Sequence, residues 1–307
     1  MRLHKSWGYA LIVFGLVMLT SSVSKMIHLD ELVAAKVEAG VERIGSNMER
    51  FGEEMDRFGA SMEKLAEGFS DGNLVIEMGS QTIELEQIKK IKLENNVGQI
   101  KVTADANAKQ ATLKYTKKLN TNEPRQEAQE RLKQVTIDVH EAGEATMLVQ
   151  SGRYLSDSLL KQFRVDYELV VPPAIAIELD TKVGDITTSG LQSDLTVIAN
   201  VAKIDIDGFK GTLHVKNNTG AISIQGGKEV KAIEVTSNVG ALKLALSEKE
   251  NLKVDAKTNV GALDSEFSLN ERRLGPSKSV QGQIGDGSTG QVTLSTNTGS
   301  ISLVKSK

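Results

Sequence analysis

The amino-acid sequence predicts a mainly β protein, in which a parallel β-solenoid domain follows an N-terminal transmembrane helix and a long amphipathic or coiled-coil helix. Three patterns in the 307 residues lead to this prediction: an uncharged N-terminal run, an unbroken heptad of apolar residues, and a corner motif that recurs every 18 to 21 residues. They divide the chain into residues 1–25, 26–70 and 71–307, and the corner motif is clearest over 180–307.

The first segment has the features of a membrane anchor. Arg2 and Lys5 precede an uncharged run over residues 7–23. About 17 helical residues span roughly 25 Å, which is enough to cross a locally thinned hydrocarbon core. Basic residues before such a run place the N-terminus in the cytoplasm and the bulk of the chain outside. A cleaved signal peptide is the alternative, with Ser22 and Ser24 as the small residues before the cut. A retained anchor makes this a single-pass protein of the cell membrane.

The second segment carries an apolar seam with heptad spacing. Steps of four and three residues alternate along Val37, Val41, Ile44, Met48, Phe51, Met55, Phe58, Met62, Leu65 and Phe69. Two interpretations stay open: a coiled coil that joins copies of the chain into a homo-oligomer, and a single helix lying on its own domain or on the membrane surface. Gly45, Gly52 and Gly59 also recur every seven residues. Each weakens a helix by about 1 kcal/mol, and together they either allow close backbone approach or reflect duplication.

Past Asp71 the apolar residues alternate with polar ones, as in half-buried β-strands. The alternation predicts strands at residues 74–76, 83–91, 91–93, 100–102, 135–139, 146–150 and 165–171. A polar segment over 122–134, with Pro124 near its start, predicts a short helix. Pro172 and Pro173 end the strand that precedes them.

The third segment repeats one corner motif: an Asn, a Val or Thr, a Gly, any residue, and then Ile or Leu. The complete copies begin at Asn96, Asn218, Asn238, Asn259 and Asn297, and their glycines are Gly98, Gly220, Gly240, Gly261 and Gly299. Two degenerate copies fit the register, one from Lys182 with Gly184 and one from Asn200 with Ala202. The 38 residues between Gly261 and Gly299 make two further units if a weaker copy lies near Gly282-Gln283-Ile284. The period of 18 to 21 residues between successive corners is the length of one solenoid coil.

A solenoid gives the corner motif a physical reason. The glycine permits the positive φ of a tight corner, and the Asn side chain two residues earlier can hydrogen-bond the backbone of the turn. Stacked coils direct Ile, Leu and Val inward and place the Asn side chains about 4.8 Å apart, close enough for an amide ladder. A sandwich of antiparallel hairpins also accommodates the alternation, but it gives no reason for the same corner in each repeat.

Composition excludes several classes of function. The chain has no cysteine, so it has no disulfide framework, thiolate metal site or cysteine nucleophile. A net charge of −3 argues against a nucleic-acid partner, and an aromatic content of 4% leaves few rings on which sugars or bases could stack. His4, His28, His140 and His214 lack metal-ligand spacing, so we expect no metal site.

Two patterns have a catalytic or cofactor interpretation beside a structural one. Gly285, Gly287 and Gly290 form a G-x-G-x-x-G motif, but a strand-like segment follows instead of the helix that a dinucleotide site requires. Asp205 and Asp207 share one outward strand face, where paired carboxylates could bind Ca²⁺ or act on polysaccharide. A glycine-rich loop and a solvated strand face are the simpler interpretations.

Two further patterns are interpreted in the same way. Asn217-Asn218-Thr219 is a glycosylation sequon, although its residues already belong to the corner motif. Lys114, Lys117 and Lys118 form a small basic patch, which we interpret as a solvated strand edge rather than an anion site.

Several stretches resemble the bacterial putative-adhesin family of unknown function. They are residues 165–172, the corner 183–186 with the Gly-x-Ile ladder after it, and the C-terminal end from 285–287 through 292–294 to 298–303. The resemblance covers about residues 72–307; Ala202, Lys182 and the polar helix depart from it. It implies a β-strand-repeat fold found in envelope proteins, often in envelope-stress contexts, and it carries no catalytic residue to transfer.

From these observations we expect a membrane-anchored, extracytoplasmic, adhesin-like binding or structural protein of the bacterial envelope, non-catalytic and without cofactor or metal. Its expected partners are the membrane, a second copy through the heptads of 37–69, and a cell-surface polymer or envelope protein. Two other functions stay open. One is a regulatory envelope-stress protein that acts on a membrane sensor, and the other is a polysaccharide-active enzyme on a β-helix scaffold.

Overall fold

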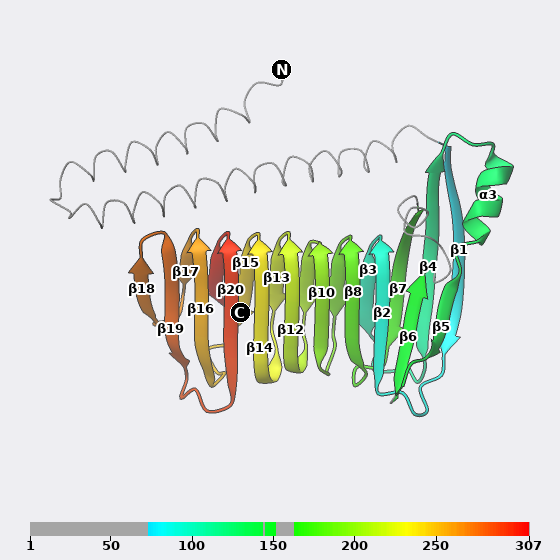
Figure 1. The fold of residues 1–307 in the computed structure, drawn as a ribbon. Helices are drawn as coiled ribbons and strands as arrows, with labels where there is room; N and C mark the ends of the chain where they lie inside the picture. Colours follow the sequence, from blue (N-terminus) through cyan, green and yellow to red (C-terminus); the bar gives the residue numbers. More distant parts are fainter. Residues whose placement is uncertain (1–72, 144, 152–162, 307) are drawn as a thin grey trace, which may run out of the picture. The chain divides into compact units, whose positions relative to one another are not determined.

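The computed structural model describes residues 73–143, 145–151 and 163–306, which form two β-sheets and the short helix α3 (Arg125–Lys133) (Figure 1). By its internal contacts the chain divides into the units Met1–Asp71 and Gly72–Lys307. The membrane span expected over 1–25 and the heptad helix expected over 26–70 lie outside the described residues. Within the described ranges, no helix has the length and apolar character that a membrane crossing requires.

The described domain is a parallel β-solenoid, as the sequence predicts. Each coil has a strand in the eleven-stranded sheet (sheet B), a corner, and a strand in the ten-stranded sheet (sheet A), and neighbouring coils pair in parallel and in register. The coils in the described part of the chain are β2 (Lys90–Val97) with β3 (Ile100–Ala104), β8 (Ala176–Val183) with β9 (Ile186–Ser189), β10 (Leu195–Val201) with β11 (Ile204–Asp207), β12 (Lys210–Thr219) with β13 (Ile222–Gln225), β14 (Lys228–Val239) with β15 (Leu242–Leu246), β16 (Leu252–Val260) with β17 (Leu263–Ser265), and β20 (Gly290–Thr298) with β21 (Ile301–Lys305).

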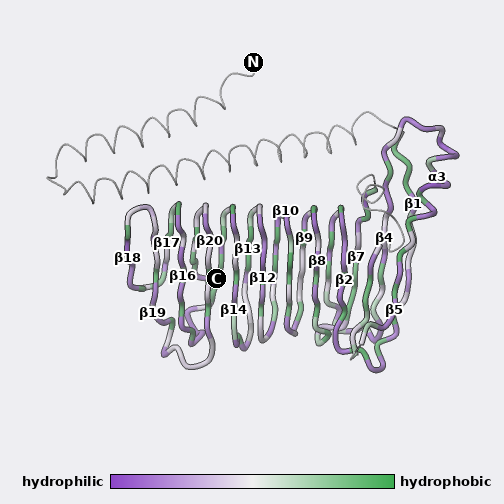
Figure 2. The backbone as a smooth tube through the Cα atoms, in the orientation of Figure 1, coloured by the Kyte–Doolittle hydropathy of each residue, from purple (hydrophilic) through white to green (hydrophobic). Residues whose placement is uncertain are grey.

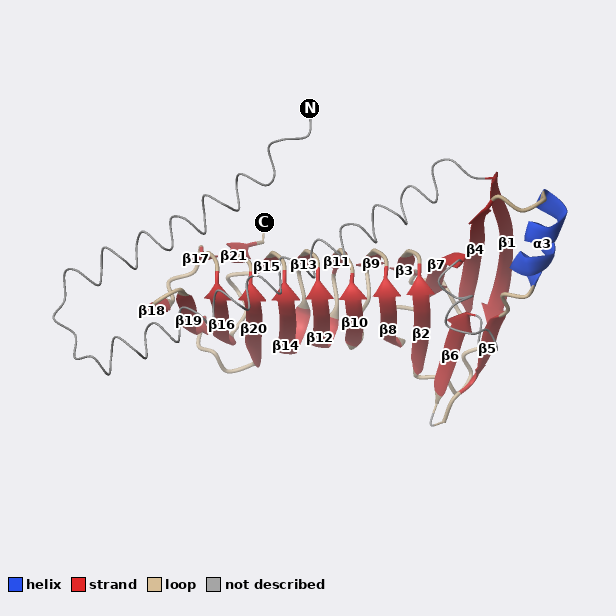
Figure 3. Cartoon of the chain, turned by 45° about the horizontal axis from the view of Figure 1, so that its top comes forward, coloured by secondary structure: helices blue, strands red, loops and turns tan. Residues whose placement is uncertain are grey.

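The coils stack in a different order from the chain at two places (Figure 3). The β2–β3 coil lies against the β8–β9 coil, although residues 105–175 lie between them in the chain. The last coil, β20–β21, is inserted between the β14–β15 and β16–β17 coils. The chain therefore completes the solenoid by filling a gap rather than by adding a final coil at its end.

The weaker corner copy expected near Gly282-Gln283-Ile284 is wrong. These residues lie in β19 (Ser277–Ile284), which pairs antiparallel with both β16 and β18 (Asn270–Leu274). Gly282 lacks the positive φ of the corner glycines, and the chain turns back after Ile284 instead of crossing to sheet A. The 38-residue gap thus holds a hairpin that covers the outer edge of β16.

Antiparallel strands cover the opposite end of the solenoid (Figure 1). They are β1 (Asn73–Ile83), β4 (Ala111–Thr121) and β7 (Phe163–Val171) in sheet A, and β5 (Ile137–Glu141) with β6 (Thr146–Ser151) in sheet B. β7 also pairs in parallel with β3, and β6 with β2. Helix α3, at the position expected from the sequence, packs against β1 and β4 and buries Ala128 and Leu132. The strand expected over 83–91 is wrong for residues 84–89, which connect the end of β1 at Ile83 to the start of β2 at Lys90.

The interior of the solenoid is made of apolar rows that run across the strands. Along the strands, hydrophobic residues are interspersed with hydrophilic ones (Figure 2). One row from each sheet consists of in-register side chains that are at most 2% exposed: Ile177, Leu195, Leu213, Ile233 and Val292 in sheet B, and Ile186, Ile204, Ile222, Leu242 and Ile301 in sheet A. Burying each side chain contributes about 1.5–3 kcal/mol relative to leaving it exposed. Because the alternation has a period of two, every second residue of each strand faces this core.

The corners stack directly on one another, and we call this stack the corner column. Its glycines have φ between +130° and +149°, where side chains are strained: Gly98, Gly184, Gly220, Gly240, Gly261 and Gly299. A Cβ added to Gly240 would lie 2.1 Å from the carbonyl oxygen of Gly220 in the next coil. The corner therefore needs glycine for two reasons, the backbone angle and the absence of a side chain.

The hydrogen-bond ladder continues through the corner column. The backbone N–H of Gly184 donates to the carbonyl of Val201 at 3.0 Å, and that of Ile186 donates to Lys203 at 2.8 Å. Ala202 keeps the equivalent bond, to Thr219 at 3.0 Å, without a positive φ. Ala202 is thus accommodated because its φ is negative, while the hydrogen bonds to the corners on both sides hold the coil in register.

We expect Gly240→Ala to lower the free energy of unfolding by about 3 kcal/mol or more, because the new Cβ would overlap the Gly220 carbonyl and strain the backbone. Gly226→Ala is the matched control: its φ is +66° and no atom lies within 4 Å of an added Cβ, so we expect a loss of about 1 kcal/mol. Urea unfolding followed by circular dichroism measures both. Equal losses in the two variants would contradict the close packing of the corners.

Thr188 interrupts an aliphatic inward row of sheet A, between Val102 and Ile206. Its side chain is fully buried, and its hydroxyl has no hydrogen-bond partner in the described structure. We therefore expect Thr188→Val to raise the free energy of unfolding by about 1 kcal/mol, since an unpaired buried hydroxyl is removed. Thr196→Val on the outward face of β10 should give no such gain in the same urea experiment. A less stable Thr188→Val protein would show that the hydroxyl contributes a favourable interaction.

Candidate functional site

A line of exposed Asn side chains follows the corner column along sheet B, and we call it the amide column. In spatial order it consists of Asn200, Asn218, Asn238, Asn297 and Asn259. Asn218 Nδ2 donates to Asn200 Oδ1 at 3.1 Å, Asn297 to Asn238 at 2.7 Å, and Asn259 to Asn297 at 2.9 Å. Each of these amides keeps further hydrogen-bonding capacity toward solvent, because Asn has two donor hydrogens and two acceptor positions.

Asn96 and Lys182 occupy the same register position in the first two coils of the stack. Asn96 is half-buried, while the side chains of the amide column are exposed. The sequence motif therefore identified every amide of the column, but the hydrogen-bonded part begins only at Asn200.

The amide column borders a shallow groove that runs along the solenoid axis on sheet B. The groove has a volume of about 460 Å³. Its floor is formed by the next outward position of successive strands, namely Asp180, Ile198, Lys216 and Thr236, which are in register. Ile198 is 38% exposed and gives this floor an apolar patch. Sequence reasoning did not single out these four residues, because only the register of the strands brings them together.

Charges of both signs lie in the groove. Burial, followed by the nearby carboxylate of Glu94, raises the pKa of Asp180 above its ordinary value, and Lys92 offsets this only in part. Lys182 and Lys216 line the groove beside Asp180. The surface is therefore polar and close to balanced in charge, which suits a ligand with many hydroxyl or amide groups better than a strongly charged one.

A buried polar row lies directly behind the amide column. It consists of the residues before the motif Asn, and those with polar side chains are Asn95, Thr181, Asn217, Ser237, Thr296 and Thr258, all at most 5% exposed. Asn217 Nδ2 donates to the carbonyl of Ala202 at 2.9 Å, and Thr258 Oγ1 donates to Gly299 at 3.0 Å. These bonds hold the corner carbonyls in place. They also explain why the sequon is structural, since its acceptor Asn217 is buried and bonded.

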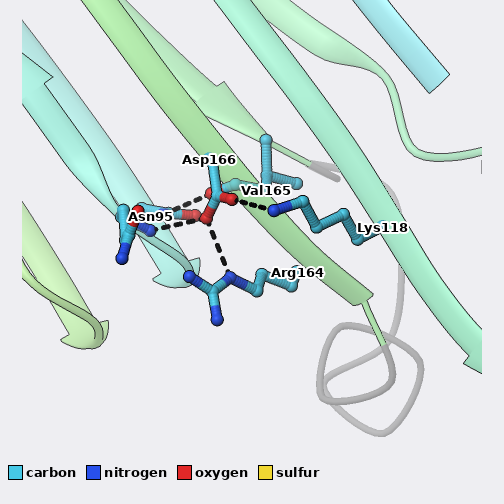
Figure 4. Close-up of polar contacts among 6 residues, drawn as sticks. Asn95, Lys118, Arg164, Val165 and Asp166 are labelled. Carbon is cyan, nitrogen blue, oxygen red and sulfur yellow. Dashed lines mark hydrogen bonds and ion pairs between the residues drawn. The ribbon is translucent and has the colours of Figure 1, made fainter. Parts of the chain in front are cut away.

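The corner column ends at β7, where Val165 and Asp166 take the place of another coil (Figure 4). The Val165 carbonyl accepts a hydrogen bond from Asn95 Nδ2 at 2.9 Å, and it lies where a Cβ on Gly98 would fall. Asp166 Oδ1 accepts from the backbone N–H of Gln99 at 2.8 Å. The Asp166 carboxylate thus satisfies a backbone donor of the corner that faces β7.

Two cations hold Asp166 in this position. Lys118 Nζ donates to Asp166 Oδ2 at 2.6 Å, and Arg164 Nε donates to Oδ1 at 2.9 Å (Figure 4). Burial by itself raises the pKa of Asp166, but the hydrogen bonds from Lys118, the Gln99 N–H and Arg164 favour the charged form. The net result is an Asp166 pKa below its ordinary value.

The other candidate residues do not converge. Asp205 and Asp207 point outward from β11 in sheet A, and Asp205 pairs with Lys203 at 2.7 Å. His214 Nδ1 lies 3.3 Å from Glu234 Oε2, far along the chain from His140 on β5. Among the described residues, no three His, Cys, Asp or Glu side chains gather closely enough to hold a metal ion. The G-x-G-x-x-G motif forms the turn between β19 and β20, with positive φ at Gly285 and Gly287.

The expected basic patch is divided between two faces of β4. Lys117 is buried, with its Nζ 2.6 Å from Glu77 Oε1 and 3.5 Å from the carbonyl of Leu132 in α3. Lys118 points to the other face and pairs with Asp166, as described above. Since adjacent strand residues face opposite sides, Lys117 and Lys118 could not have formed one surface.

A parallel β-solenoid with a polar groove along one sheet is, as a class of protein, a repeat scaffold with an extended surface. The family model described as Toastrack DUF4097 matches residues 71–304, and the chain belongs to this family. This match confirms the resemblance to the putative-adhesin family that was inferred from the sequence. No curated protein matches the chain.

Two solved structures illustrate what the chain is similar to. One is a putative cell adhesion protein from Clostridium sporogenes, with 16% identity, a TM-score of 0.43, and coverage of 76% of this chain and 100% of that chain. The other is a putative adhesin from Bacteroides fragilis, with 12% identity, a TM-score of 0.32, and coverage of 74% of this chain and 97% of that chain.

We expect Asp166→Asn to lower the free energy of unfolding at neutral pH by about 1–3 kcal/mol, because charge-assisted hydrogen bonds are lost. The folded-state pKa of Asp166 lies below the unfolded value of about 3.9, so its stabilisation is complete above that pH and is lost as pH falls through the folded pKa. Unfolding measured across the acid range should show the two proteins converging. Asp205→Asn, which removes an exposed ion pair, should change stability little. A difference between wild type and Asp166→Asn that stays constant with pH would contradict this role.

Proposed function

We propose that this protein is a non-catalytic binding and scaffold protein of the bacterial envelope. In this proposal the N-terminus anchors it in the cell membrane, the bulk of the chain faces outward, and the groove on sheet B binds an extended, hydroxyl-rich polymer such as a cell-wall glycan. The observation that carries the proposal is the groove itself, in which amide groups recur once per strand beside an apolar and mildly charged floor.

The spacing of the amide column supports a polymeric ligand. Neighbouring strands lie about 4.8 Å apart, so equivalent polar groups repeat at that distance along the groove. This repeat is similar to the length of one sugar unit in an extended β-1,4-linked chain, and successive sugars could therefore meet equivalent partners. Sugar hydroxyls both donate and accept hydrogen bonds, as do the Asn side chains, and Ile198 offers an apolar surface to the C–H face of a sugar ring.

Envelope location is supported by the sequence alone. The basic start and the uncharged run over 7–23 favour a single-pass anchor with the solenoid outside. Family membership supports an adhesin-like binding or structural role. No observation among the described residues favours the enzyme hypothesis, because the carboxylates proposed for it lie on sheet A, away from the groove, and one of them is paired with Lys203.

The groove can be tested with two charged double variants in the full chain, kept in detergent micelles. We expect Ile198→Glu with Thr236→Glu to weaken binding to purified cell-wall sacculi and to chitin by roughly tenfold or more, because both substitutions place bulk and charge on the groove floor. Ser223→Glu with Lys243→Glu, outward on sheet A, is the control and should bind like the wild type. Co-sedimentation measures all three proteins.

Two results would count against this function. If the wild type sediments with neither polymer, the groove does not bind glycan. If the groove variant and the control bind equally well, the polymer binds elsewhere on the chain. Recovery of a membrane sensor protein with the wild type in the absence of glycan binding would instead favour the regulatory alternative.

A further inference from the structure

Strand β1 carries an unusual surface for this domain. It is one of the two edge strands of the described sheet A, and it pairs with β4 on one side only. On its outward face Leu74, Ile76 and Met78 are 43%, 49% and 77% exposed, and we call these three side chains the β1 stripe. The inward residue Val75 is buried, and Glu77 pairs with Lys117 on the side where α3 packs.

The β1 stripe stands out because the rest of the described surface has few large apolar residues. The others that are exposed are Ile198, Val260 and Leu274, which lie on three separate strands. Outward positions of sheet A beyond β1 are polar or charged in most coils. An apolar edge strand of this kind is normally covered, because it would otherwise pair or aggregate with another chain.

The sequence just before the β1 stripe carries a second apolar pattern. The heptad seam of residues 37–69 ends at Phe69, five positions before Leu74. As a helix, this segment would present apolar residues along about 50 Å. The β1 stripe extends over only about 13 Å of strand, so it is much shorter than the expected seam.

A second copy of this chain fits both surfaces. We infer that two copies pair in parallel through the seam of residues 37–69, and that the two β1 stripes cover each other where the paired helices end. In a parallel pair both Phe69 residues lie at the same end of the seam, and each β1 begins within five residues of it, a reach of at most about 17 Å. An antiparallel pair would leave the stripes about 50 Å apart and still exposed.

The charges of the seam segment favour a protein partner over a lipid surface. Residues 37–69 contain eight acidic and four basic residues. Helices that lie on membranes usually carry an excess of Lys and Arg, because membrane surfaces are anionic. The three heptad-spaced glycines next to the seam also leave room for a second helix to approach closely.

Disulfide crosslinking of the full chain in detergent micelles tests this pairing. The protein has no cysteine, so one introduced thiol reports on a single position. Under mild air oxidation we expect Ile76→Cys to form a disulfide-linked dimer roughly tenfold faster than Leu274→Cys, because paired stripes hold two thiols at high effective concentration. Leu274, on β18 near the other end of the solenoid, is 80% exposed and serves as the control for random collision.

A seam variant separates the two parts of the inference. Met55→Lys with Met62→Lys, added to Ile76→Cys, should abolish the crosslink and reduce the mass measured by light scattering to that of one chain, while circular dichroism of the β domain stays unchanged. A crosslink that survives these substitutions overturns the pairing through the seam. Equal crosslinking at positions 76 and 274, or a single-chain mass for the unsubstituted protein, overturns the inference as a whole.

The membrane surface is the other occupant that the experiment can reveal. A polarity-sensitive dye on Ile76→Cys that shifts its emission on addition of anionic lipid vesicles, with no crosslink in micelles or vesicles, would assign the β1 stripe to lipid and overturn the pairing. None of these measurements involves a glycan, so the pairing and the proposed function of the groove succeed or fail separately.

Discussion

The close approach of one corner to the next is the constraint on which the rest of this structure depends. A glycine with positive φ sits against the carbonyl of the corner beside it, as Gly240 does against Gly220. This contact allows hydrogen bonds to pass around the bend without interruption. Parallel strands, continuous apolar rows and the amide column all follow, since each requires successive coils to stay in one register.

The two ends of the stack show how such a ladder is closed. At β7 the Asp166 carboxylate accepts a hydrogen bond from a backbone N–H of the last corner, and two cations hold it there. At the other end the β18–β19 hairpin pairs with the edge of β16. Both solutions cover open strand edges, which would otherwise be available to other chains. The described sheet A ends at β1 and β17, and the described sheet B ends at β18 and β5. Among these edge strands, β1 differs in carrying three exposed large apolar side chains.

Much of the coil architecture could be predicted from the sequence because its cause is local. The Asn and Gly of each motif copy lie within three residues, and the two-residue alternation states which side chains face inward. The order of the coils in space could not be predicted, because every coil carries a similar corner motif and the motif does not determine which two coils pair. Gly282 resembled a corner by spacing alone, and only its backbone angle and antiparallel pairing distinguish it.

The groove shows the same limit for the candidate site. Its amides were visible as part of the motif, but Asp180, Ile198 and Lys216 occur at unremarkable positions about 18 residues apart. Their significance arises from register, which the sequence indicates only after the coils are placed. For Lys117 and Lys118 the sequence suggested a shared surface that does not exist. These residues are adjacent in the chain but lie on different faces of a strand.

The insertion of the last coil has a consequence for how the protein is made. Most solenoids can grow from one end, with each new repeat adding to a finished one. Here the strands β14 and β16 emerge from the ribosome before the strand that belongs between them. A chain interrupted before residue 290 would lack the strands that join β14 to β16 in sheet B and β15 to β17 in sheet A, so the native sheets can form only after these strands have been made. The β20–β21 coil thus joins the coils on both of its sides. Products that lack it are incompletely folded, and such chains are substrates for the quality-control proteases of the cell.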